Sequence, residues 1–138
     1  MDVASRTGES RLELVLTSEA GQERAEALAH QLLERRLVAC ATLLPGRSLY
    51  RWRGRIEHET EVLLLLKTAA AQLAALHAAL LELHSYETPE WIHWSAASGG
   101  GYALWLAEQL RPESNAGISP DAASPAPAAT PGAGDPAG

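Results

Sequence analysis

The sequence feature that most constrains the fold is the stretch from 38 to 68, where segments with strand character follow one another closely. Residues 38–44 are mostly apolar and end at Pro45-Gly46, a pair that favours a turn. Residues 49–57 then alternate in character with a period of two, as in a half-buried strand. We therefore predict one long β-hairpin arm in this stretch.

The alternation also predicts which side chains share a face of the arm. Arg51, Arg53 and Arg55 would lie on one face, and the opposite face would carry Tyr50, Trp52, Gly54 and Ile56. We predict that the chain reverses at residues 57–60, before the apolar run 62–66, which is typical of a central strand covered on both faces. Glu57, Glu59 and Glu61 would then pair with the arginines, either across the hairpin or across a subunit interface.

Before the arm, the sequence predicts one strand and one helix. Residues 11–17 alternate between leucines and other side chains, which predicts a first strand. Ser18 is the predicted N-cap of the helix that follows. Apolar residues recur there at three- and four-residue spacing and predict one buried stripe: Ala25, Leu28, Ala29, Leu32 and Leu33.

After the arm, Thr68 is the predicted cap of a second helix, from Ala69 to about His84. Its buried stripe would be Leu73, Leu76, Leu80 and Leu83. The predicted elements that follow are a loop at 85–90, a fourth strand at 91–96, a flexible Gly-rich link at 98–101 and a short helix at 102–110.

Both ends of the chain lack the pattern of a packed domain. Residues 1–10 are polar, without the apolar core of a signal peptide, and we predict a disordered leader. Residues 111–138 are dominated by Ala, Pro and Gly, which predicts a disordered tail. The domain would therefore span 11–110. One cysteine and no apolar run of membrane-spanning length fit a cytoplasmic protein with no membrane partner.

The order of elements predicts an α+β fold, a ferredoxin-like βαββαβ antiparallel sheet with a long hairpin between its second and third strands and a C-terminal helix. Right-handed crossovers would place both long helices on one face of this sheet. The other face and the arm would then remain uncovered, which soluble proteins avoid. We therefore predict self-association, with Tyr50, Trp52 and Ile56 at the oligomer interface.

Charge and motifs exclude several classes of function. Eleven basic residues face seventeen acidic ones, so a nucleic-acid partner is disfavoured. The sequence has no nucleophile elbow, no phosphate-binding glycine loop and no helical two-histidine metal motif. We predict no catalytic residues and no enzyme activity. Cys40, on an apolar segment, is expected to be an inert, buried side chain.

Three residues are candidate metal ligands. His84, Glu87 and Glu90 recur at intervals of three, and His93 continues the pattern. Imidazole and carboxylate groups suit divalent ions such as copper(II), zinc or nickel. We predict that His84, Glu87 and Glu90 bind Cu(II) or another divalent metal. The alternative is that they are polar residues that end a helix and bound a loop, since a helix C-terminus by itself favours His84.

The order and spacing of several motifs resemble the CutA family, the divalent-cation tolerance proteins. The resemblance covers roughly residues 11–110 and rests on these segments: 37–41 (LVACA), Pro45-Gly46, 50–57 (YRWRGRIE), 61–62 (EV), 67–68 (KT), 84–90 (HSYETPE) and Tyr102 with Trp105-Leu106. It implies a homotrimer with arms that pair between neighbouring subunits, a role in the response to metal ions, and metal binding without catalysis.

The resemblance also shows where this chain departs from the family pattern. Copper-binding members use a cysteine at the end of the first strand, where this chain has Thr17, and a histidine pair, of which only His84 is present. The alternative function is a small-molecule sensor trimer of the nitrogen-regulator type, with its ligand between subunits near Tyr86 and Glu90. An RNA-binding sheet is a weaker alternative, because segment 62–66 lacks the aromatic residues of that module.

Overall fold

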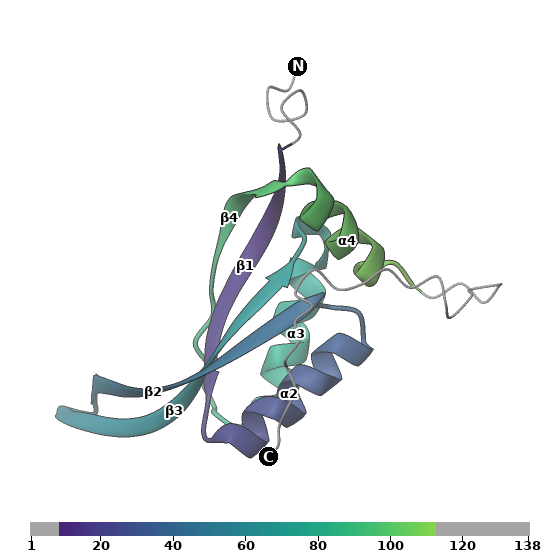
Figure 1. Ribbon diagram of the computed structural model, residues 1–138. Helices are drawn as coiled ribbons and strands as arrows, with labels where there is room; N and C mark the ends of the chain where they lie inside the picture. The colour runs from purple at the N-terminus through teal and green to yellow at the C-terminus, as the bar shows by residue number, and fades with distance from the viewer. Residues whose placement is uncertain (1–8, 113–138) are drawn as a thin grey trace, which may run out of the picture.

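The computed structural model of the protein describes residues 9–112, which form one sheet, three α-helices and a projecting arm (Figure 1). The elements are β1 (Glu9–Glu19), α2 (Gln22–Glu34), β2 (Cys40–Trp52), β3 (Arg55–Thr68), the short 3-10 helix η1 (Ala70–Gln72), α3 (Leu73–Leu83), β4 (Ile92–Gly99) and α4 (Gly100–Leu110). None of the helices in this part of the chain is long and apolar enough to cross a membrane.

The four strands form one antiparallel sheet in the order β2-β3-β1-β4. The leucine-rich half of β3 lies between β2 and β1, where both of its edges are paired. Its run from Leu63 to Leu66 can therefore be apolar on both faces. This order, with helices in both crossovers, confirms the predicted ferredoxin-like α+β fold.

The main core lies between the sheet and the two crossover helices. Ala25, Leu28, Ala29 and Leu32 of α2 and Leu76, Ala79 and Leu80 of α3 pack on the sheet residues Val15, Val62, Leu64 and Leu66. Burial of these side chains is the main source of stability for the domain. The predicted stripe of α2 is confirmed except for Leu33, which is 39% exposed.

Among residues 9–112, the helix α4 covers one end of the opposite face of the sheet. Leu106 and Leu110 of α4 pack there against Leu12 and Ala39. Beyond α4, this face presents Leu44, Ile92 and Trp94, each between 44% and 49% exposed. The prediction of an uncovered face is therefore confirmed for the part that α4 does not reach, and we call this part the open face.

The arm is a two-stranded ribbon that projects from the body of the domain (Figure 1). Its strands pair without a break from Cys40↔Lys67 to Trp52↔Arg55, and the chain reverses at Arg53 and Gly54, both with positive φ (52° and 80°). The prediction of a long hairpin is confirmed, but the predicted return at residues 57–60 is wrong. The glycine allows the tight two-residue turn.

Pro45-Gly46 also lies within β2 and makes no turn, because Pro45 pairs with Val62 and Gly46 with Glu61. A proline is tolerated there because β2 is an edge strand of the sheet.

Because the chain reverses at Arg53 and Gly54, the residues that share a face of the arm differ from those we predicted. Directly paired residues of antiparallel strands lie on the same side, so Trp52 lies with Arg55, whereas Arg51 lies with Ile56. The prediction of three arginines on one face is therefore wrong. The predicted interface set Tyr50, Trp52 and Ile56 is also divided, because Ile56 lies on the face opposite the two aromatic residues.

Several helix and strand boundaries in the structure also differ from the predicted ones. β1 runs from Glu9 to Glu19, so the last two residues of the predicted leader belong to a strand, and Ser18 cannot cap α2. Gly21 precedes α2 instead. Thr68 ends β3, where its hydroxyl donates to the Leu37 carbonyl oxygen over 2.7 Å. The predicted Gly-rich link is divided between β4 and α4. The rest of the predicted leader and the tail beyond residue 112 lie outside the described residues.

Candidate functional site

A cleft of about 620 Å³ lies where the arm leaves the body of the domain. It is lined by Ser18 and Ala20 of the β1 end, by Ser48, Leu49, Tyr50 and Trp52 of β2, by Glu59 and Glu61 of β3, and by Tyr86, Glu87, Thr88 and Glu90 of the loop before β4. Its volume falls in the range of small-molecule sites. Four of the twelve lining residues are glutamates and none is basic, so the cleft is acidic.

Glu61 is hydrogen-bonded to three other residues that line the cleft. Its side chain accepts hydrogen bonds from Ser48 Oγ (2.7 Å), Tyr86 Oη (2.7 Å) and Ser18 Oγ (3.3 Å). These donors come from β2, β1 and the loop before β4, so one carboxylate joins three parts of the fold. Glu61 is 8% exposed, and a carboxylate this deeply buried requires such donors.

Tyr86 is held as a hydrogen-bond donor by this environment. Burial, the hydrogen bond to Glu61 and the negative charges of Glu61, Glu19 and Glu59 all raise the pKa of Tyr86 well above its ordinary value of 10.0. The phenol therefore keeps its proton at any physiological pH.

Glu19 forms a second buried carboxylate centre behind the cleft. It accepts hydrogen bonds from Ser85 Oγ (2.6 Å), Ser85 N–H (3.0 Å) and Ala20 N–H (2.8 Å). Burial alone would raise the pKa of Glu19, but these hydrogen bonds, with a smaller effect from His84, lower the pKa below its usual value of 4.5. Glu19 thereby fixes the start of the loop that carries Tyr86, Glu87 and Glu90.

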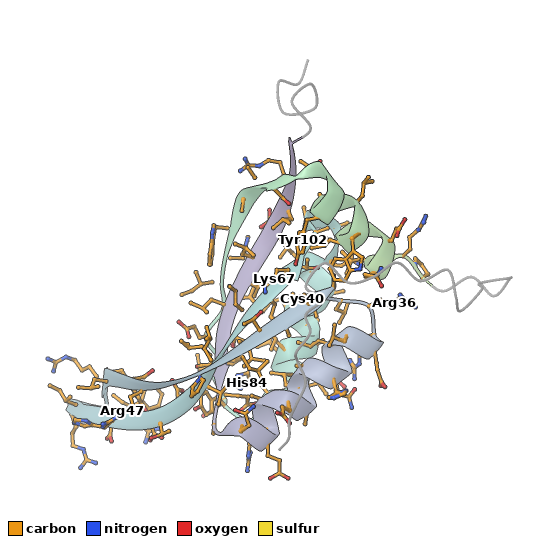
Figure 2. The ribbon with its side chains drawn as sticks, in the orientation of Figure 1. Arg36, Cys40, Arg47, Lys67, His84 and Tyr102 are labelled. Atoms are coloured by element: carbon orange, nitrogen blue, oxygen red, sulfur yellow. The ribbon has the colours of Figure 1, made fainter. Side chains whose placement is uncertain are left out.

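His84 is buried at the junction between the arm and the body (Figure 2). Its Nδ1 accepts the Tyr86 backbone N–H over 3.0 Å, so its Nε2 carries the proton and donates to the Ser18 carbonyl oxygen over 2.5 Å. Glu19 Oε2 also lies 3.5 Å from Nδ1, but an Nδ1 that accepts the N–H has no proton to share with it. Both ring nitrogens of His84 are therefore occupied.

The predicted metal ligands are brought to the same region but do not form a metal site in one chain. Glu87 and Glu90 line the cleft, whereas His84 lies behind it with its nitrogens bonded to the backbone. Among residues 9–112, no three His, Cys, Asp or Glu side chains gather in a way that could hold a metal ion. Direct ligation by His84 would require its present hydrogen bonds to break.

Two other residues considered at the sequence level lie elsewhere. His93 is on β4, with Nδ1 3.3 Å from Glu13 Oε1 and its ring against Trp91. Thr17 is fully buried on the face of β1 that the crossover helices cover, and its Oγ1 has no hydrogen-bond partner within the described part of the chain. Neither residue lines the cleft.

Cys40 is only partly buried and has polar neighbours, in contrast to the apolar surroundings we predicted. Lys67 Nζ donates to Cys40 Sγ over 3.6 Å and to Thr42 Oγ1 over 2.5 Å. Tyr102 lies nearby, and burial, followed by the effect of Cys40, raises the pKa of this tyrosine (Figure 2). These neighbours could not be predicted from the sequence, because the lysine comes from β3 and only the strand pairing places it beside Cys40.

The hydrogen-bonding set Ser18, Ser48 and Glu61 was missed as a site at the sequence level. Its members are 13 to 43 residues apart in the chain and share one face of three different strands. The two-residue alternation of Ser48 with Tyr50, and of Glu59 with Glu61, was a usable signal. This signal identifies the site only when the pairing of β2 with β3 is known, and the turn predicted at residues 57–60 gave the wrong pairing.

Comparison with known proteins gives consistent matches. A sequence model of the family described as "CutA1 divalent ion tolerance protein" matches residues 13–109. The chain is 45% identical over 89 residues to the "Divalent-cation tolerance protein CutA" of Pectobacterium atrosepticum, covering 63% of this chain and 81% of the relative. It is 41% identical over 100 residues to the protein of the same name from Citrobacter koseri, covering 71% and 87%.

The solved structures agree with the sequence matches. The structure of CutA from Synechococcus elongatus PCC7942 superposes with a TM-score of 0.71 at 37% sequence identity, covering 73% of this chain and 91% of that chain. The family match, residues 13–109, runs from β1 into α4 and includes the arm and the residues that line the cleft.

Proposed function

The chain belongs to the CutA1 divalent ion tolerance protein family, and from this premise we propose that it acts in divalent cation tolerance by binding a divalent metal ion as a homotrimer, without catalysis. The observation that carries the proposal is the acidic cleft, whose lining holds four glutamates and no basic residue. Carboxylate oxygens are ligands for many divalent ions. The alternative of a nitrogen-regulator-type sensor is not favoured, because the family and the relatives are named for cation tolerance.

Self-association is supported by exposed apolar side chains. The open face presents Leu44, Ile92 and Trp94, and the arm presents Leu49, which is 63% exposed, and Trp52. Large apolar side chains exposed on one face of a sheet and on a projecting arm mark candidate protein–protein interaction surfaces. Sedimentation at several protein concentrations measures the mass directly, and a mass of three chains is expected. A folded monomer at micromolar concentration would contradict the homotrimer.

The metal part of the proposal rests on Glu87 and Glu90 at the cleft, with Cu(II) or another divalent ion as the ligand. Since no third ligand joins them within the described residues, we propose that a neighbouring subunit completes the coordination. Among the predicted ligands, His84 would then hold the loop and not contact the metal.

Calorimetric titration with Cu²⁺ and Zn²⁺ at neutral pH tests this part. Glu87→Gln with Glu90→Gln is expected to weaken uptake at least tenfold, whereas Glu34→Gln, exposed on α2, is the matched control. Absence of metal uptake by the intact oligomer would refute the metal part and leave the homotrimer standing.

A cytoplasmic location stays a prediction, supported by the single cysteine of the sequence. Fractionation of cells that express the full chain tests it, and recovery from a secreted or periplasmic fraction would contradict it.

A further inference from the structure

Three aromatic rings lie against one another where the loop before β4 ends. The indole of Trp91 stacks on the imidazole of His77, on α3, with ring centroids 4.3 Å apart and planes 17° apart. The ring of His93, on β4, lies 5.7 Å from the same indole and is tilted by 56°. We call these three residues the His–Trp–His cluster. It joins α3, the loop and β4 at one point.

The cluster anchors one end of the loop that lines the cleft. Residues 84–91 connect α3 to β4, and we call them the cleft loop. Tyr86 is tied to Glu61 near the start of this loop, and Trp91, which packs against the main core, is held by the two histidines at its end. Glu87 and Glu90 lie between these two anchors and line the cleft. The position of their carboxylates therefore depends on how firmly Trp91 is held.

Both histidines of the cluster can gain a positive charge in mild acid, because imidazole is the side chain that ordinarily titrates between about pH 5 and pH 8. A protonated His77 places that charge over the indole of Trp91, and indole faces attract cations. A protonated His93 also forms an ion pair with Glu13 of β1, whose Oε1 lies 3.3 Å from His93 Nδ1. Protonation therefore adds an attractive contact to each histidine.

Among residues 9–112, the charged groups that face the cluster from β1 are Glu13 and Arg11. The Nε of Arg11 donates to Ser95 Oγ over 3.3 Å, so this guanidinium is directed to a hydroxyl group. Residues 73–81, which surround His77 on α3, contain no other titratable side chain. Glu13 offsets the repulsion between two imidazolium rings, because its carboxylate is close to one of them and its side chain is only 13% exposed.

The cluster is separate from the surfaces that we propose for self-association. His93 pairs with Val15, whose side chain lies in the main core, so His93 is on the face of the sheet that the crossover helices cover. The open face is on the other side of the sheet. The side chain of His93 is 42% exposed, so the cluster can exchange protons with solvent even when the open face is covered.

We propose that the His–Trp–His cluster is a pH-sensitive latch for the cleft loop. In mild acid, protonated His77 and His93 hold Trp91 more tightly, and the loop opens less often. In mild alkali both rings are neutral and hold the indole less firmly. The inference goes beyond the proposed function, because it concerns the loop and requires no bound metal. It adds a regulatory property, since Glu87 and Glu90 are then positioned more firmly at pH 5.5 than at pH 8.

Hydrogen exchange of the metal-free full chain tests the latch at pH 5.5 and pH 8, both above the range in which carboxylates ordinarily titrate. The backbone N–H groups of Ser85 and Tyr86 are hydrogen-bonded, so their protection from exchange measures opening of the cleft loop. At each pH, the protection factor of the wild type is divided by that of the variant with His77→Gln and His93→Gln. We expect this ratio to be about threefold higher at pH 5.5 than at pH 8.

His30→Gln, exposed on α2, is the matched control, and its ratio should be the same at both pH values. His84 also contacts the loop, because its Nδ1 accepts the Tyr86 N–H. Its titration cancels in the ratios, since His84 is present in every protein compared. Circular dichroism at both pH values shows that each variant is folded.

A ratio that is equal at the two pH values, or lower in acid, would overturn the latch. Repeating the comparison with Trp91→Leu in every protein removes the indole, and the dependence of the ratio on pH should then disappear. A rise in acid that persists without the indole would mean that the histidines act in another way, and it would also overturn the proposal. Absence of metal uptake would refute the proposed metal binding without affecting these metal-free measurements, so the two can fail separately.

Discussion

The hydroxyl of Tyr86 donates a hydrogen bond of 2.7 Å to Oε2 of Glu61, and this contact ties the loop before β4 to the strand that carries the arm. The two residues are 25 positions apart and belong to elements that are not neighbours in the sheet. The contact therefore sets the position of Glu87 and Glu90, which follow Tyr86, relative to Glu59 and Glu61 on β3. The shape of the cleft therefore depends on this contact together with the hydrogen bonds from Ser85 to Glu19, which hold the start of the loop.

Tyr86→Phe removes the contact while keeping the ring. Glu61 then retains only its two serine donors, so we expect the free energy of unfolding to fall by about 2 kcal/mol, as for other hydrogen bonds to a buried charge. Urea denaturation at fixed protein concentration measures the change. Tyr50→Phe is the matched control, because Tyr50 is 40% exposed and the same change should cost little. Equal effects of the two substitutions would contradict the role given to Tyr86.

Glu19 should make the fold sensitive to acid. Because hydrogen bonds hold the folded-state pKa of Glu19 below its usual value of 4.5, the carboxylate stabilises the fold above that pH. This contribution is lost as the pH falls through the lowered folded-state pKa. Glu19→Gln should therefore lower the melting temperature at pH 7, and the deficit relative to the wild type should shrink between pH 5 and pH 3.

The control for this measurement is Glu34→Gln, at an exposed position on α2. It should leave both the melting temperature at pH 7 and the acid profile close to those of the wild type. A deficit for Glu19→Gln that stays constant from pH 7 to pH 3 would mean that the lost contacts are independent of charge, and it would contradict the pKa argument.

Thr17 offers a substitution that should stabilise the protein. Its hydroxyl is buried without a hydrogen-bond partner among the described residues, which is unfavourable for a polar group. Thr17→Val keeps the shape and removes the hydroxyl, so we expect a gain of about 1 kcal/mol in the free energy of unfolding. Thr42→Val is the comparison, because it removes the hydroxyl that accepts from Lys67, and it should not stabilise. A loss of stability in Thr17→Val would contradict this interpretation.

The fold could be predicted from the sequence because its main signals are local. The leucine alternation of β1, the apolar stripe of α2 and the run Leu63–Leu66 each record burial on a sheet or helix, and together they determine the order of elements. The turn could not be placed this way. Pro45-Gly46 is a stronger local turn signal than Arg53-Gly54, but the edge position of β2, which only the complete sheet defines, makes the proline acceptable within the strand.

The site was less predictable than the fold, for the same reason. Glu87 and Glu90 were identified and do line the cleft, because a polar loop between a helix and a strand is recognisable in sequence. The partners of Glu61 come from three segments that only the pairing register brings together. His84 was interpreted as a ligand because of its residue type, whereas its hydrogen bonds to the Ser18 carbonyl and the Tyr86 N–H give it a structural role.

The turn of the arm can be tested by exchanging glycines. Gly54 has φ of 80°, where a side chain is strained, so Gly54→Ala should cost about 1 kcal/mol of stability. Gly99 has φ of −63° and open space where a Cβ would lie, so Gly99→Ala is the matched control and should be neutral or slightly stabilising. Thermal denaturation measures the melting temperatures of both variants. Equal melting temperatures for Gly54→Ala and Gly99→Ala would contradict a turn at Gly54.

Trp52 should matter for assembly more than for the folding of a single chain. The ring is 49% exposed near the tip of the arm, and the guanidinium of Arg53 lies 5.4 Å from its centre. A large aromatic residue left exposed on a projecting ribbon is typical of an interface residue. Trp52→Ala should therefore weaken association by about 30-fold, the effect expected of an interface hot spot, while the circular dichroism spectrum stays unchanged.

Leu81→Ala provides the comparison for this change. Leu81 is 57% exposed on α3, which packs on the face of the sheet opposite the open face, so its truncation should leave association unaffected. Sedimentation velocity over a dilution series measures the dissociation constants of both variants and of the wild type. If Trp52→Ala and Leu81→Ala dissociate at the same concentration as the wild type, the arm does not hold the subunits together, and the interface must be sought on the open face around Leu44, Ile92 and Trp94.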